Sequence, residues 1–101
     1  MLFQIVHTHT NENCPGRSPE QLKPIANWWQ GFKKASGVKV LGGYVTPLDH
    51  TYYITVEADD YSTLARALGP LMTVGTGHVI PVLTIDQTLP IAESGAFRES
   101  K

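Results

Sequence analysis

The chain has 101 residues, of which 42% are hydrophobic and 17% are charged, and its formal net charge at pH 7 is −1. This length fits one small domain, and eight Lys/Arg against nine Asp/Glu give no basic surface for nucleic acid. No apolar run approaches the ~18–20 residues of a membrane span, and a single cysteine excludes an internal disulfide. Met1 leads directly into an apolar strand without a basic leader, so we expect a cytoplasmic protein with neither nucleic acid nor membrane as a partner.

The N-terminal segment, residues 2–10, is typical of a strand, because apolar residues are followed by alternating His and Thr. Side chains alternate across a strand, so His7 and His9 should point to one face, roughly 6–7 Å apart. The loop that follows, residues 11–17, carries the only cysteine, Cys14, and can fold it back toward both rings. Two imidazoles and a thiolate indicate a soft-metal or reactive site.

A helix is predicted next. The run Ser18-Pro19-Glu20-Gln21 is a capping-box pattern with proline at the first helical position, and apolar residues then recur at helical spacing until Gly37, the expected stop. Pro24 interrupts this pattern, so either the helix kinks there, or Ser18 caps a short separate turn and the main helix begins at Pro24. Trp29 falls on the apolar stripe, which leaves Trp28 as the tryptophan more available to a pocket or an interface.

The remaining elements follow from composition. Residues 38–46 and 51–58 are dense in β-formers and are joined by a Pro-Leu-Asp-His turn, which predicts a β-hairpin. Asp59-Asp60 should cap a second helix, and Gly69-Pro70 should end it. A fourth strand is predicted over residues 78–86, and residues 87–101 are expected to form a C-terminal arm.

The resulting order, β-α-β-β-α-β, is that of the ferredoxin-like fold, an α+β class in which a four-stranded antiparallel sheet carries two helices on one face. We expect this single domain to span residues 1–86. Apolar and aromatic residues fall on both parities of the strands, so the second face of the sheet should also be covered. A second copy of the chain is the expected cover, in a homodimer or a higher homo-oligomer.

Three segments resemble the dimeric α/β-barrel superfamily: residues 37–44, the acidic stretch 56–60 before a Leu/Ala helix, and residues 79–83. They look closest to a domain-of-unknown-function branch, and the opening Met-Leu-Phe-Gln-Ile-Val looks like that of muconolactone isomerases. The resemblance covers residues 1 to about 86. It implies that two ferredoxin-like subunits pack sheet against sheet and enclose a pocket between sheet and helices. Isomerases and oxygenases occur in this superfamily, but no catalytic residue is carried over.

The predicted metal ligands are His7, His9 and Cys14, with His50 or His78 completing the site. Zinc, copper and iron would each accept mixed imidazole and thiolate ligands, although the spacing H-x-H-x₄-C matches no established zinc signature. The competing interpretation has no cofactor: both strand histidines then line a pocket, and the thiol is incidental to its loop. Cys14 as a nucleophile or redox thiol is a third interpretation.

A metal-free alternative makes His7 or His9 the catalytic residue, a general base on a small aromatic or lactone substrate. Trp28, Tyr44 and Tyr53 are the predicted substrate-binding residues, although core or dimer packing is the simpler role for most aromatic side chains. A metal-dependent oxygenase or isomerase needs a closed pocket containing one of these histidines. A non-catalytic metal- or ligand-binding or sensing module needs the same residues without a substrate-sized cavity.

Overall fold

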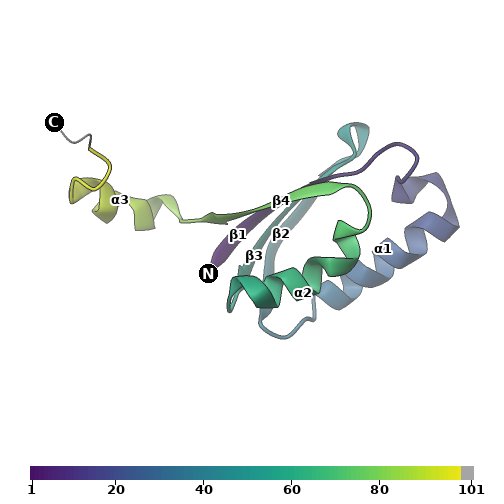
Figure 1. Ribbon diagram of the computed structural model, residues 1–101, viewed down its shortest axis with the longest axis horizontal. Coiled ribbons are helices and arrows are strands. Elements are labelled where there is room, and N and C mark those ends of the chain that lie inside the picture. Colours follow the sequence, from purple (N-terminus) through teal and green to yellow (C-terminus); the bar gives the residue numbers. More distant parts are fainter. Residues whose placement is uncertain (99–101) are drawn as a thin grey trace.

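The computed structural model describes residues 1–98. Its regular elements are β1 (Leu2–Thr8), η1 (Pro15–Arg17), α1 (Pro19–Phe32), β2 (Val38–Thr46), η2 (Pro47–Asp49), β3 (Thr51–Ala58), α2 (Tyr61–Met72), β4 (Thr76–Val82) and α3 (Ile85–Glu93). The strands form one antiparallel sheet in the order β2-β3-β1-β4, and α1 and α2 lie on the same side of it (Figure 1). The predicted ferredoxin-like arrangement is therefore confirmed.

The hydrophobic core lies between the sheet and the two helices α1 and α2. Alternate residues of β1 point into it: Phe3, Ile5 and His7 are each at most 1% exposed. The same alternation continues past the strand and buries His9. The apolar core residues are Phe3, Ile5, Phe32, Val38, Ile54, Val56, Ala58, Leu64, Leu68 and Leu71. The two histidines thus extend the row of side chains that forms the core.

Both predicted helix caps are confirmed. The Ser18 hydroxyl accepts a hydrogen bond from the Gln21 amide at 3.2 Å, and the Asp60 carboxylate accepts one from the Thr63 amide at 2.7 Å. Helix α1 is one continuous helix with Pro24 inside it, so the alternative of a separate first turn does not hold. Strands β2 and β3 have the ranges that the sequence predicted. Residues next to the ends of each strand signal where it begins and stops.

Helix α2 continues through Gly69 and Pro70 to Met72, so the predicted stop was wrong. Pro70 lies in the last turn, where its missing N–H removes only one hydrogen bond. Leu68 and Leu71 on the inner face are each 1% exposed, and their burial holds that turn against the core. Tertiary packing here outweighs two residues that disfavour helix locally.

The end of the chain also differs from expectation. Strand β4 ends at Val82 rather than at residue 86, because its partner there is Leu2, the first residue of β1. Helix α3 follows, in much of the region expected to be an arm, and projects away from the sheet and the other helices (Figure 1). A reciprocal capping box begins it: the Thr84 hydroxyl accepts from the Gln87 amide, and the Gln87 side chain accepts from the Thr84 amide. Within residues 1–98, the helices lack the length and apolar character that crossing a bilayer requires.

The side of the sheet away from α1 and α2, called the open face below, carries aromatic side chains. Tyr44 pairs with Tyr53, Tyr53 with Val6, and Val6 with His78, so these four residues form one row across that face. Tyr44 is 73% exposed, and Ile80 lies two residues after His78 on the same face at 45%. Both faces of the sheet are therefore partly apolar, as the strand parities predicted.

The continuity of α2 can be tested at Gly69. A Cβ at this position would meet no atom within 4 Å. Because alanine is favoured over glycine inside a helix, we expect Gly69→Ala to raise the free energy of unfolding by about 0.5–1 kcal/mol in urea denaturation. Gly31→Ala in α1, where a Cβ is equally unobstructed, is the matched control and should give a gain of the same sign. A loss of stability in Gly69→Ala alone would mean that the helix ends before this residue.

Candidate metal-binding site

Three soft ligand groups meet where β1 leaves the sheet. A ring nitrogen of His9, the Cys14 Sγ and a ring nitrogen of His50 all lie within 4.8 Å of one another. The His9 and His50 rings are 5.1 Å apart between centroids and inclined at 69°. Two imidazoles bound to one tetrahedral zinc ion have ring centres about 5 Å apart, given Zn–N bonds of about 2.0–2.1 Å. These two rings therefore lie at the spacing of ligands to a common metal.

Backbone pairing holds the two histidines opposite each other. Strand β1 pairs with β3 up to Thr8 opposite Thr51, whose hydroxyls lie 3.0 Å apart in a hydrogen bond. The pairing then continues past both strands, because the His9 amide donates to the His50 carbonyl at 3.0 Å. Two candidate ligands that are far apart in the chain are thus brought together by the register of the sheet.

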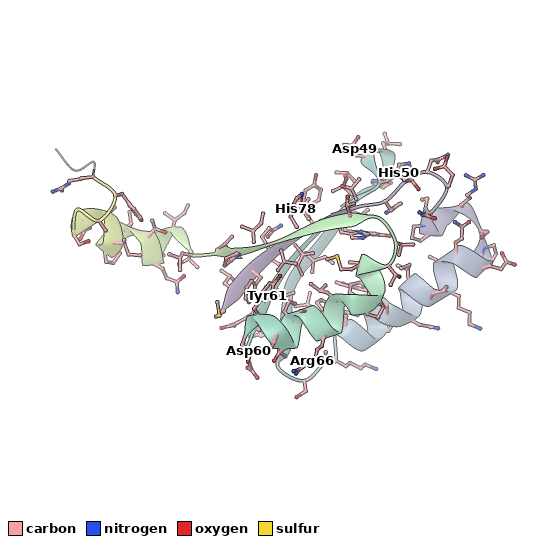
Figure 2. The ribbon with its side chains drawn as sticks, in the orientation of Figure 1. Asp49, His50, Asp60, Tyr61, Arg66 and His78 are labelled. Atoms are coloured by element: carbon pink, nitrogen blue, oxygen red, sulfur yellow. The ribbon has the colours of Figure 1, made fainter. Side chains whose placement is uncertain are left out.

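His50 occupies a backbone conformation that usually belongs to glycine or asparagine. It ends η2 with φ 52° and ψ 39°, and within the described chain it is the one non-glycine residue with positive φ. The Thr51 hydroxyl donates to the Asp49 carbonyl at 3.0 Å and helps to hold the turn. Figure 2 labels Asp49 and His50 in this turn. A bulky residue in this region costs of order 1 kcal/mol or more, and such residues are frequent at functional sites.

Cys14 is carried by a loop that is built from turns and anchored to α1. Its amide donates to the Asn11 carbonyl at 3.3 Å, and its carbonyl accepts from the Arg17 amide at 3.0 Å. The Gln21 side-chain amide donates to the Glu12 carbonyl at 2.6 Å, which ties this loop to the first turn of α1. The thiol is half-buried, so it can reach the two imidazoles while it remains accessible from solvent.

The imidazoles at this end of the core lack partners within residues 1–98. His7 lies beside His9 with ring centroids 6.5 Å apart, and neither nitrogen of either ring makes a hydrogen bond. The Nδ1 of His50 is also unpaired. The hollow around the two strand histidines is too small to hold a water molecule. Since an unpaired buried polar group costs about 1–3 kcal/mol, these nitrogens destabilise the protein unless a ligand pairs them.

Burial keeps the strand histidines neutral. It lowers the pKa of His7 below the ordinary histidine value, although the nearby backbone carbonyls of Val74 and Leu71 partly offset this. Burial also lowers the pKa of His9, and repulsion from the charged forms of His50 and His7 lowers it further. Both rings are therefore unprotonated at neutral pH, which is the form that binds a metal ion.

Tyr52 separates the histidines from an apolar groove. Its ring centroid lies 6.0 Å from that of His7 and 5.4 Å from that of His9. Burial, and then the negative charge that Cys14 can carry, raise the pKa of its hydroxyl. Beyond it lies a groove of about 290 Å³ between α1 and the β2–β3 hairpin. The groove is lined chiefly by Ile25, Trp28, Trp29, Val45, Tyr52 and Ile54.

The structure brings some of the predicted ligands together and leaves one apart. His9, Cys14 and His50 form the group, and His7 lies next to it. His78 lies on the open face, opposite Val6 (Figure 2). Because neighbouring residues of β1 point to opposite faces, the sheet itself stands between His78 and the group.

The predicted substrate-binding aromatics are likewise divided. Trp28 lines the groove, and its indole N–H donates to the Ala67 carbonyl at 2.8 Å, which joins α1 to α2. Tyr44 borders the groove, but its ring lies over Gly42 on the open face, where Tyr53 lies opposite it. These two tyrosines therefore present their rings away from the histidines.

Two further aromatic residues, Tyr52 and Trp29, line the groove together with Trp28. A Cβ at Gly43 would stand 2.7 Å from the Trp29 ring, so the glycine makes room for the indole against β2. Tyr52 shares its strand parity with the buried Ile54, and this was the available signal that its ring faces the helices.

The comparisons with known proteins identify a family without an assigned activity. A family model described as a domain of unknown function, DUF3303, matches residues 1–96. No curated protein matches the chain. The expected relation to a branch of unknown function is thereby supported, whereas the likeness to muconolactone isomerases has no support.

The lowered histidine pKa values predict an acid-labile metal-free protein. Because the unfolded chain takes up protons near the ordinary histidine pKa of about 6.5 and the folded chain only at lower pH, stability is present above that pKa. It should fall as the pH is lowered toward about 5, by at most about 1.4 kcal/mol per pH unit for each histidine. Urea unfolding of chelator-treated protein measures this slope. His7→Leu should reduce it and His78→Asn should not; a stability that does not change over this pH interval would contradict the prediction.

Proposed function

The chain belongs to the DUF3303 family, and we propose that it binds a soft transition-metal ion, Zn²⁺ or Cu⁺, through His9, Cys14 and His50. One observation carries the proposal: three ligand atoms from two separate loops converge within 4.8 Å, beside buried imidazole nitrogens that have no partner within residues 1–98. Imidazole and thiolate are the ligands that these ions prefer. Iron would accept the same set, whereas Mg²⁺ and Ca²⁺ require oxygen ligands.

Metal binding needs only a modest closure of this group. Ligand atoms around a tetrahedral zinc ion lie about 3.5 Å apart, given bonds of about 2.0–2.3 Å. The present separations reach up to 4.8 Å, so a shift of about 1 Å is required. His9 is fixed by its backbone hydrogen bond to His50. The half-buried Cys14 side chain is therefore the group that would close on the ion.

The surroundings favour a binding or sensing role over catalysis. A catalytic metal needs an open coordination position that faces a substrate. The hollow at His7 and His9 is too small for a substrate, and the 290 Å³ groove lies on the far side of Tyr52. Metal uptake is therefore the activity that the geometry supports best.

A second candidate, a metal-dependent isomerase or oxygenase acting on an apolar small molecule, is favoured by one contact. Tyr52 touches both the groove and the histidines, so a ligand in the groove would lie one side chain from the metal. A small aromatic molecule such as phenol should then quench the tryptophan fluorescence and also shift the spectrum of cobalt-loaded protein. Quenching without a spectral shift would exclude this candidate.

The proposed metal site predicts one equivalent of Co²⁺ or Zn²⁺ per chain in untagged protein. The cobalt complex should show thiolate charge-transfer absorption that Cys14→Ser abolishes. His50→Asn preserves the left-handed backbone but removes the imidazole, and it should weaken Zn²⁺ binding by at least about tenfold, the effect of losing even an outer-shell partner. His78→Asn is the matched control, because it removes an imidazole from the open face. No stoichiometric uptake, or equal affinity in all three variants, would reject the proposal.

We also propose that two copies of the chain associate through the open face. The exposed row of Tyr44 and Tyr53 supports this, as does α3, whose Ile85 and Leu89 are 81% and 52% exposed. A helix of this length is marginal in water without tertiary contacts, so a second copy would also supply its cover. We expect a dimer in sedimentation experiments and a monomer in Tyr53→Glu. Leu48→Glu, in the hairpin turn at 96% exposure, is the control that should stay dimeric. A monomeric wild-type protein at high micromolar concentration would refute the interface.

A further inference from the structure

His7 has a side chain that can bind a metal, but it does not belong to the group of His9, Cys14 and His50. It is 1% exposed, which is the most complete burial of any of the four histidines. Both of its ring nitrogens lack a hydrogen-bond partner within the described chain. A histidine that served packing alone would normally have at least one nitrogen paired, because leaving it unpaired costs about 1–3 kcal/mol. Its position beside His9 therefore requires another explanation.

We propose that His7 is a fourth protein ligand, so that three imidazoles and one thiolate enclose the ion and no coordination position stays open. The inference rests on the proposed metal-binding function and deepens it. His7 lies in β1 and His9 follows the strand by one residue, and both side chains are buried on the same side of the chain with their rings next to each other. Their centroids are 6.5 Å apart, against about 5 Å for imidazoles on one zinc ion, so a displacement of roughly 1.5 Å would give the two rings the spacing of ligands to a common ion.

The surroundings of the His7 ring suit a metal ligand. A metal-bound imidazole usually donates its second N–H to a carboxylate or backbone carbonyl, which fixes the orientation of the ring. The backbone carbonyls of Leu71 and Val74 lie near the ring, although neither makes a hydrogen bond to it as it stands. A small shift of the ring would give one nitrogen an outer partner of this kind and leave the other for the ion.

Close packing also excludes a solvent ligand at this position. The Tyr52 ring stacks against His7 at an interplanar angle of 26°. On another side β4 passes so near that a Cβ at Gly77 would lie 3.3 Å from the His7 Cδ2. The hollow around His7 and His9 has no room for a water molecule, so a ligand on this side of the ion would have to be a side chain. A closed site of this kind retains metal for storage, sensing or structure and does not activate a water.

The coordination count in the unmodified protein tests the inference directly. We expect X-ray absorption of the zinc-loaded wild type to show three imidazole nitrogens and one sulfur. Azide should leave the visible spectrum of the cobalt-loaded wild type unchanged, because no position is open. His7→Ala opens one, so azide should then shift the spectrum, and Zn²⁺ affinity should fall at least about tenfold. His78→Ala is the control, which should match the wild type in both measurements.

The outcomes distinguish the role of His7 as a ligand from the metal-binding function itself. Two imidazoles, one sulfur and one oxygen around zinc in the wild type, or azide binding to wild-type cobalt protein, would overturn the role of His7 and leave the metal-binding function standing. A wild type that takes up neither Co²⁺ nor Zn²⁺ would overturn both. If His7→Ala does not fold, the ligand count in the unmodified protein decides the question.

Discussion

The antiparallel pairing of β1 with β3 is the interaction on which both the core and the candidate site depend. It presents Phe3 and Ile5 to the helices and continues the same row with His7 and His9. A slip of one residue would turn this entire row to the open face and would remove the core and the site together. The hydrogen bond from the His9 amide to the His50 carbonyl extends the pairing beyond the strands. The sheet therefore positions two candidate ligands with the same bonds that hold the fold.

Two unfavourable features occur together at the candidate site. Imidazoles with unpaired nitrogens occupy the end of an otherwise apolar row, and His50 adopts a backbone conformation that suits glycine or asparagine. Each costs free energy that the rest of the core has to offset. Proteins break such rules chiefly at functional positions. The proposed soft metal ion would take one nitrogen from each ligating ring and draw on the half-buried Cys14, at the same place as the left-handed His50.

Local signals account for much of what could be predicted. The hairpin strands, residues 38–46 and 51–58, have the expected ends, and the caps at Ser18 and Asp60 form as expected. Each depends on residues within a few positions of one another. The stop at Gly69 and Pro70 failed because the opposing force, burial of the inner face of α2, comes from distant residues. The start of α3 also has a local signal, the capping box of Thr84 and Gln87, although an arm was expected in this region.

The amino-acid sequence alone determined that His7 and His9 share a face and that Cys14 follows within loop reach, because strand alternation is a property of the backbone. It did not determine which of His50 and His78 joins them. That choice depends on strand register, which places His50 across from His9 and turns His78 to the open face. The packing of α1 on the hairpin likewise decided which aromatic rings line the groove. Parity along a strand says which side chains lie together, and only packing says what lies opposite them.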